Sequence, residues 1–343
     1  MIAKFTLLVS IIFSTLGLNG TAVKYDNSVV QQITGNSKIV QASPASVLLP
    51  DLQIKPKILK SLSNNSIYAK NYLLADDEHS QTFARQNADI QVPIASTTKI
   101  MTATIVLQNY NLSDIVTMSQ SAVAETGASV DFYVGEQFTV QELLYCMLIK
   151  SENGAAYALA EHANTSGETG VDKFVGMMNE KAKLLGMDDT HYQDPAGLDD
   201  TGYSTAYDLL LATKYALKDP LFAQIVDTSA YTAHTVDGKN AIQLPNSNRL
   251  VGAWNYPGAI GVKTGFTDGA GHCLVGAARR NGHTLIAIVL HTDSTAADAS
   301  ATEVKKLLDW GFTNIDWGDG SNNSVITTTQ KSSGNISTGA SDL

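Results

Sequence analysis

The sequence predicts an α/β fold in which an antiparallel sheet is flanked by helices and an all-helical lobe is inserted into the chain. Apolar residues follow strand-like periodicity near the start and end of the chain and helix-like periodicity between them. The Asn281-Gly282 pair, between two apolar strand-like runs, is typical of a tight antiparallel hairpin. Together these patterns favour one sheet built from both ends of the chain.

The first elements are a strand hairpin and a helix. A strand over 66–75 breaks at the polar run 76–80 and resumes at 82–84 as its hairpin partner. A helix is then predicted to begin near Ser96, where a Pro-led loop meets the helix-period apolar residues Ile100, Met101, Ala103, Ile105 and Val106.

Helical patterns dominate the middle of the chain. The run from Thr139 to Glu142 is a capping-box pattern that starts a helix. Further helices are predicted over 155–162, over 171–185 and from Thr205 to Lys218, where Pro220 follows. These segments form the predicted helical lobe.

Strand patterns return after residue 230. They cover 231–236, 241–244, 260–266, 273–278 and 284–290, and a closing helix is predicted over 301–308.

Length and composition suggest an exported globular protein. The chain has 343 residues, of which 44% are hydrophobic and 16% charged, enough for one large core or two modest ones. Residues 1–22 carry Lys4, an apolar run and small residues, which is the pattern of a secretory signal peptide, with a retained N-terminal anchor as the alternative. We expect a flexible leader over 23–58, a catalytic domain over 59–318 and a disordered polar tail over 319–343.

Charge and metal-ligand patterns exclude several functions. The net charge of -10 argues against nucleic acid as a partner. The sequence contains neither a His-Glu-x-x-His pair nor a Cys/His cluster, so it does not suggest a metal site. Cys146 and Cys273 lie in apolar runs, where buried and unpaired thiols are favoured over a disulfide.

Ser96 and Lys99 form the first chemical motif. On a helix, positions i and i+3 share one face, so the Lys amine would reach the Ser hydroxyl. A Ser hydroxyl needs a base to become a nucleophile, and a Lys amine serves only where burial or another cation favours its neutral form. Taken alone, Ser-x-x-Lys is more often an N-cap beside a solvated lysine.

Two further motifs follow in order. Ser151-Glu152-Asn153 lies at a junction between two helix-like segments, and Lys263-Thr264-Gly265 lies in a strand-like run. Each alone has a structural explanation, such as a helix cap or an exposed strand pair. The ordered set, however, is the recorded signature of class A β-lactamases and penicillin-binding proteins.

The chain resembles the low-molecular-mass penicillin-binding proteins, which are serine-type D-alanyl-D-alanine carboxypeptidases of peptidase family S11. The resemblance covers roughly residues 60–316 and includes the stretches 93–103, 194–198, 261–267 and 270–275. It implies a β-lactamase/DD-peptidase-like fold and no cofactor.

The resemblance also implies residue roles. Ser96 would be acylated by the penultimate D-Ala, Lys99 would be its base, and Ser151 would relay a proton to the leaving amine. Asn153 would hold the substrate amide and the Lys99 side chain. Three further residues would complete the site: Lys263 as a positive charge that helps to keep Lys99 neutral, Thr264 as carboxylate ligand, and Phe266, whose backbone N–H forms the oxyanion hole with that of Ser96. A side chain at Gly265 would crowd a substrate lying along the strand.

Three features depart from the family pattern. Residues 291–300 contain no Arg, although many relatives use one there for carboxylate recognition. Gly154 follows Asn153 at a position where an acidic residue is frequent in the family. After the catalytic unit comes only the polar tail, without a basic amphipathic stretch, so we expect no strong membrane anchor after signal cleavage and a secreted, wall-associated protein.

The expected substrate is a peptidoglycan stem peptide ending in D-Ala-D-Ala, with β-lactams as covalent inhibitors. Alternatives are a D-Ala endopeptidase of the same fold, a β-lactamase, or a non-catalytic protein that binds β-lactams or cell wall. The chain between the second and third motifs lacks a Glu-x-x-x-Asn deacylation loop, which disfavours rapid β-lactam turnover.

Overall fold

The computed structural model describes residues 56–318, apart from 64–65, 79–80, 126, 128–130, 164–169 and 293–294. The predicted signal peptide, the polar tail and nearly all of the predicted leader lie outside these residues. The leader prediction extends too far at its end, because β1 (Lys57–Ile58) pairs antiparallel with β11 (Ile315–Asp316). Among the described residues, no helix has both the length and the hydropathy needed to cross a bilayer.

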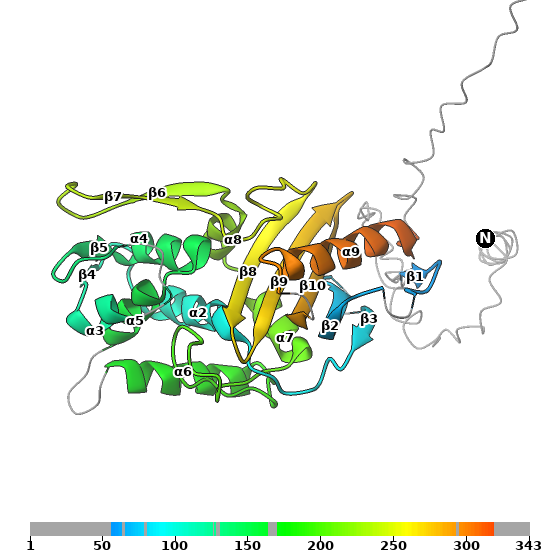
Figure 1. The fold of residues 1–343 in the computed structure, drawn as a ribbon, viewed down its shortest axis with the longest axis horizontal. Helices are drawn as coiled ribbons and strands as arrows, with labels where there is room; N and C mark the ends of the chain where they lie inside the picture. Colours follow the sequence, from blue (N-terminus) through cyan, green and yellow to red (C-terminus); the bar gives the residue numbers. More distant parts are fainter. Residues whose placement is uncertain are drawn as a thin grey trace, which may run out of the picture. The chain divides into compact units, whose positions relative to one another are not determined.

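A five-stranded antiparallel sheet forms the centre of the fold (Figure 1). Its strand order is β3-β2-β10-β9-β8, so β8 is an edge strand. The strands are β2 (Ala69–Asp76), β3 (Thr82–Gln86), β8 (Ala259–Thr267), β9 (Gly271–Arg280) and β10 (His283–Thr292). The predicted Asn-Gly turn joins the last two, with φ of 51° at Asn281 and 87° at Gly282. Both ends of the chain therefore build one sheet, as predicted.

Side chains alternate between the two faces of the sheet because successive residues of a strand point in opposite directions. On β10, Ile286 and Ile288 belong to the core cluster shared with α2 (Lys99–Asn109) and α7 (Ala206–Ala216). Their neighbours Leu285 and Ala287 belong to the cluster shared with α9 (Ala299–Asn314). Helices thus cover both faces, with α9 on one face and α2 and α7 on the other (Figure 1).

The inserted lobe is helical, with a small sheet, and its predicted helices are present with shifted ends. It contains α3 (Gln120–Ala124), α4 (Val140–Tyr145), a π-helix (Cys146–Lys150), α5 (Asn153–Glu161), α6 (Gly170–Leu184), and the paired strands β4 (Ile115–Thr117) and β5 (Gln137–Thr139). Thr139 caps α4 by accepting a hydrogen bond from the backbone N–H of Glu142. Helix α4 therefore begins directly after Thr139, the N-cap residue of the predicted capping box.

Helix α8 (Pro220–Asp227) is not among the predicted helices. Pro220, before which the preceding helix was predicted to stop, also occupies the first turn of a new helix, where its missing N–H costs nothing. Asp219 caps this helix through the backbone N–H groups of Leu221 and Phe222.

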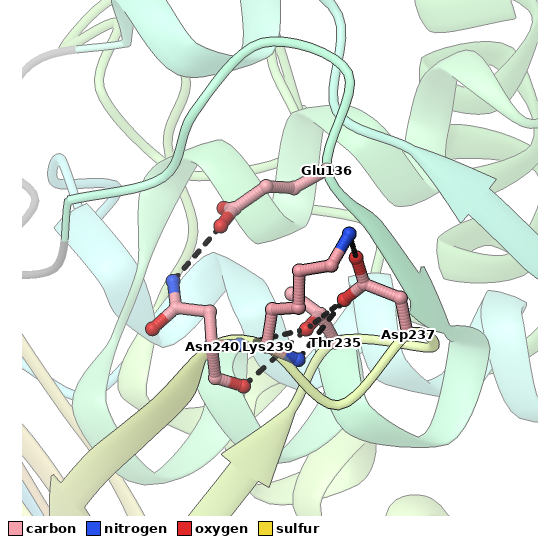
Figure 2. A network of polar contacts seen from close by, with 5 residues as sticks. All are labelled: Glu136, Thr235, Asp237, Lys239 and Asn240. Atoms are coloured by element: carbon pink, nitrogen blue, oxygen red, sulfur yellow. Dashed lines mark hydrogen bonds and ion pairs between the residues drawn. The ribbon is translucent and has the colours of Figure 1, made fainter.

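Strands β6 (Ala230–His234) and β7 (Ala241–Pro245) form a separate hairpin outside the main sheet. A polar network fastens its turn to the lobe (Figure 2). Asn240 Nδ2 donates to Glu136 Oε1 at 2.9 Å, while Asp237 accepts from Thr235 Oγ1 at 2.8 Å and pairs with Lys239 Nζ at 2.9 Å. The Asn240–Glu136 contact thus joins the hairpin turn to the residue that precedes β5.

Candidate active site

Ser96 and Lys99 lie side by side at the start of α2. Ser96 lies in a 3₁₀ helix (Ala95–Thr98), not in the predicted α-helix, and Lys99 is the first residue of α2. Residues i and i+3 eclipse in a 3₁₀ turn. Lys99 Nζ consequently lies 2.8 Å from Ser96 Oγ.

Lys99 is fully buried, and its amine has three acceptors. Besides Ser96 Oγ, they are Asn153 Oδ1 at 2.7 Å and the carbonyl oxygen of Ala196 at 2.8 Å. Burial lowers the pKa of Lys99 to about 7, against the opposing effects of Asp194 and Glu152. On losing its proton, the amine can keep donating to Asn153 and Ala196 while its lone pair faces Ser96 Oγ.

Asp194 fixes the loop that supplies the Ala196 carbonyl. Its buried carboxylate accepts four backbone N–H bonds, two at 2.6 Å and the others at 2.9 and 2.7 Å, from Ala196, Gly197, Leu198 and Asp199. An Asp that folds the following loop in this way is the mechanism of the Asx turn. In the sequence this stretch is marked only by its likeness to the family, and nothing in it indicates the contact with Lys99.

Ser151 and Asn153 form the opposite wall. The π-helix ends at Lys150, the next residue Ser151 is left-handed with φ of 72°, and α5 begins at Asn153. The left-handed residue reverses the chain sharply between the two helices. Ser151 Oγ thereby accepts from Lys263 Nζ at 2.7 Å, while Asn153 faces Lys99.

Lys263 and Thr264 come from the edge strand β8. The Lys263 side chain is buried, and its amine also donates to the Thr264 carbonyl oxygen at 3.0 Å. Burial lowers the pKa of Lys263 well below its ordinary value, and the charge on Lys99 lowers it further, while Glu152 opposes the shift. The two amines therefore disfavour each other's protonation.

Glu152 is a buried acidic residue beside this pair. Its exposed fraction is 1%, and its charge raises the pKa of both Lys99 and Lys263. In the sequence, Glu152 is only the middle residue of the second motif. Its position between Ser151 and Asn153 indicates that it lies near the site, but the sequence does not show that its side chain is buried.

Close packing joins β8 to the loop that carries Ser96. A Cβ at Gly265 would lie 3.0 Å from the carbonyl oxygen of Ile94 and 3.1 Å from the backbone nitrogen of Ser96. The structure thus explains the glycine at position 265 by close packing against the Ser96 loop, whereas the sequence led us to expect that a side chain there would crowd the substrate. Ala95 is itself left-handed, with φ of 47°, and a Cβ at Gly197 would lie 2.0 Å from its carbonyl oxygen.

Phe266 and Gly154 lie at the margins of this arrangement. The Phe266 side chain is 55% exposed, and its ring centroid lies 4.5 Å from that of His272. A Cβ at Gly154 would lie 2.7 Å from the carbonyl oxygen of Ala122 in α3, so packing of α3 on α5 explains the missing acidic side chain.

Neither cysteine contributes to this site. Cys146 and Cys273 are buried and unpaired, as predicted. No group of three or more His, Cys, Asp or Glu residues in the described part of the chain has an arrangement that could hold a metal ion.

A buried lysine beside a serine, with a second Ser-Lys contact opposite, is the arrangement expected of the class that contains the penicillin-binding proteins and class A β-lactamases. The family model for D-alanyl-D-alanine carboxypeptidase, peptidase S11, matches residues 58–294. The chain belongs to this family.

Relatives and solved structures agree with this assignment. The chain is 37% identical over 244 residues to a D-alanyl-D-alanine carboxypeptidase of Streptomyces sp. strain K15, covering 67% of this chain and 82% of that protein. It is 34% identical to a D-alanyl-D-alanine endopeptidase of Pseudomonas aeruginosa, covering 70% and 76%. The crystal structure of the Streptomyces K15 DD-transpeptidase matches with a TM-score of 0.69 at 35% identity, covering 73% and 99%.

Proposed function

We propose that the protein is a serine-type D-Ala-D-Ala carboxypeptidase that removes the terminal D-Ala from peptidoglycan pentapeptide stems. The observation that carries the proposal is the contact of Lys99 Nζ with Ser96 Oγ at 2.8 Å, in a buried setting that lowers the lysine pKa to about 7. A base whose pKa lies near the working pH is suited to proton transfer.

In the proposed acylation step, neutral Lys99 takes the proton of Ser96 Oγ, which attacks the carbonyl carbon of the penultimate D-Ala. The backbone N–H groups of Ser96 and Phe266 stabilise the resulting oxyanion, where one such donor is typically worth about 3 kcal/mol. The C–N bond then breaks, and the leaving amine of the terminal D-Ala receives a proton through Ser151, which contacts Lys263 Nζ. Water attacks the ester in the second step and regenerates Ser96.

In the proposed complex, Asn153 holds the substrate amide and Thr264 binds the terminal carboxylate beside the charge of Lys263. Gly265 allows β8 to approach Ser96 closely. The step needs no cofactor. β-Lactams would acylate Ser96 and persist as covalent adducts. A protein with this substrate would act outside the cell, at the wall.

Release of free D-Ala from diacyl-Lys-D-Ala-D-Ala tests this function directly. We expect release by the protein and none by Ser96→Ala, with both variants showing the same circular dichroism. No release by the folded wild-type protein would contradict the carboxypeptidase proposal.

Similarity to an endopeptidase favours a second candidate, cleavage of D-Ala cross-links by the same acyl-enzyme. Purified cross-linked muropeptides, offered in the same assay beside the pentapeptide, distinguish the two. We expect faster turnover of the pentapeptide, whereas preferential conversion of dimers to monomers would assign the endopeptidase reaction.

A further inference from the structure

Ser247 connects the two walls of the site, although no motif includes it. It follows the β6–β7 hairpin. Its backbone N–H donates to the carbonyl oxygen of Ile149 at 2.9 Å, two residues before Ser151. Its hydroxyl lies 3.0 Å from Thr264 Oγ1 on β8. The residue therefore has a fixed backbone and a side chain directed at the third motif.

The Ser247–Thr264 pair can bind an anion. A hydroxyl has one hydrogen to donate, so only one of the two hydrogens can lie between these oxygens and the other can be donated elsewhere. Both residues are partly exposed, which leaves them accessible to a ligand. Lys263 Nζ lies 3.5 Å from Thr264 Oγ1, and in its protonated form it adds positive charge to the same spot.

A carboxylate matches this arrangement in both shape and charge. When the hydrogen bond between the two hydroxyls opens, each can donate its hydrogen to one carboxylate oxygen, and the exchange is favourable because hydrogen bonds to a charged acceptor are the stronger kind. Residues 291–300 contain no Arg. Of the arginines near the start of β10, Arg279 donates to Thr284 and Arg280 to the carbonyl oxygen of Pro257.

We infer that Ser247 is a specificity-determining residue: with Thr264 it forms a two-hydroxyl subsite for the terminal carboxylate of the substrate. This inference rests on the proposed function and deepens it. Ser247 selects peptides with a free C-terminus, and its backbone hydrogen bond to Ile149 holds it in place.

The test compares acylation of Ser96 by benzylpenicillin with acylation by its methyl ester, followed as the mass increase of the intact protein. The wild-type protein should prefer the free acid. Ser247→Ala should reduce that preference about tenfold or more, since a hydrogen bond to a charged group is lost, while the rate with the ester changes little. Ser247→Thr keeps the hydroxyl and should retain the preference.

Two controls separate specificity from structure. Arg249→Ala should retain the preference for the acid. Ser247→Ala should reduce this preference less when it is introduced into the Thr264→Ala variant than when it is introduced into the wild-type protein. Equal slowing with acid and ester in a folded Ser247→Ala protein would assign a merely structural role and overturn the inference. An unchanged preference, or its loss in Arg249→Ala, would also overturn it. Absence of acylation in the wild-type protein would instead reject the proposed function, and the subsite with it.

Discussion

Lys99 Nζ donates to the carbonyl oxygen of Ala196 at 2.8 Å, although the two residues are 97 positions apart. The acceptor is a backbone atom in a loop folded around Asp194. Together with Asn153 Oδ1, it anchors the lysine while leaving the serine side of the amine for chemistry. This contact makes the position of the base depend on a loop outside the three motifs.

The Lys99 amine should be essential as a base. We expect Lys99→Met to lower acylation by a fluorescent penicillin by about 10²–10⁴-fold, the usual contribution of a general base. The exposed Lys218→Met serves as the matched control and should react normally. Comparable rates in the two variants would reject Lys99 as the base.

Acylation should rise with pH through about 7. Burial lowers the pKa of Lys99 to about 7, so the reactive neutral amine is scarce below that value and abundant above it. The midpoint of the pH–rate profile is located by measuring acylation rates between about pH 5 and 9. This range is centred on neutral pH, where the pKa of the base is expected to lie. A rate that still rises without a plateau at the upper end of this range, as a base with the ordinary lysine pKa of 10.5 would give, would contradict this assignment.

Glu152→Gln should shift this midpoint to lower pH. The Glu152 charge raises the pKa of Lys99 by stabilising the ammonium form, and glutamine removes the charge at similar size. The pH–rate profile provides the measurement. Glu180→Gln, an exposed substitution on α6, should leave the midpoint unchanged; a shift of equal size in both variants would point to a general charge effect.

Asp194→Ala should destabilise the fold and slow acylation together. Four backbone N–H groups lose their acceptor, and each that stays buried and unpaired costs about 1–3 kcal/mol. Thermal unfolding and penicillin acylation report the two effects. Asp199→Asn changes a nearby exposed carboxylate and should have little effect on either, so similar losses in both variants would count against the loop argument.

Gly265→Ala should slow acylation more than it destabilises the protein. The added methyl group would press on Ile94 and Ser96, which carry the nucleophile loop. Gly176→Ala in α6 is the control: apart from the backbone of its own helix, no heavy atom would lie within 4 Å of the added Cβ, and the change should stabilise the helix by up to about 1 kcal/mol. Normal acylation by folded Gly265→Ala would refute the steric account.

The sequence predicted the sheet and most helices because their apolar periods are regular. It could not show that strands 230–245 pair only with each other, because periodicity identifies a strand but not its partner. The α-helix expected at Ser96 starts three residues later, since the apolar repeat begins at Ile100 and leaves the turn before it undetermined.

The motif residues of the candidate site could be predicted from the sequence, but the residues that hold them in place could not. Ser96, Ser151 and Lys263 belong to motifs that follow one another in a recognisable order. The Ala196 carbonyl is a backbone atom, which no residue type marks, and Glu152 looks like any surface acid until its burial is known. Ser247 escaped notice because a lone serine in a loop carries no pattern.

Ala95 and Ser151 both adopt left-handed backbone conformations, with φ of 47° and 72°; Ala95 directly precedes Ser96, and Ser151 is itself one of the proposed catalytic residues. Such a conformation costs a non-glycine residue about 1–3 kcal/mol, which the surrounding fold must supply. Both loops would relax as soon as their neighbours loosen, well before the central sheet melts. On gradual warming, penicillin binding should therefore disappear at a lower temperature than the far-ultraviolet signal of the sheet, so that loss of activity is the first sign of heat damage.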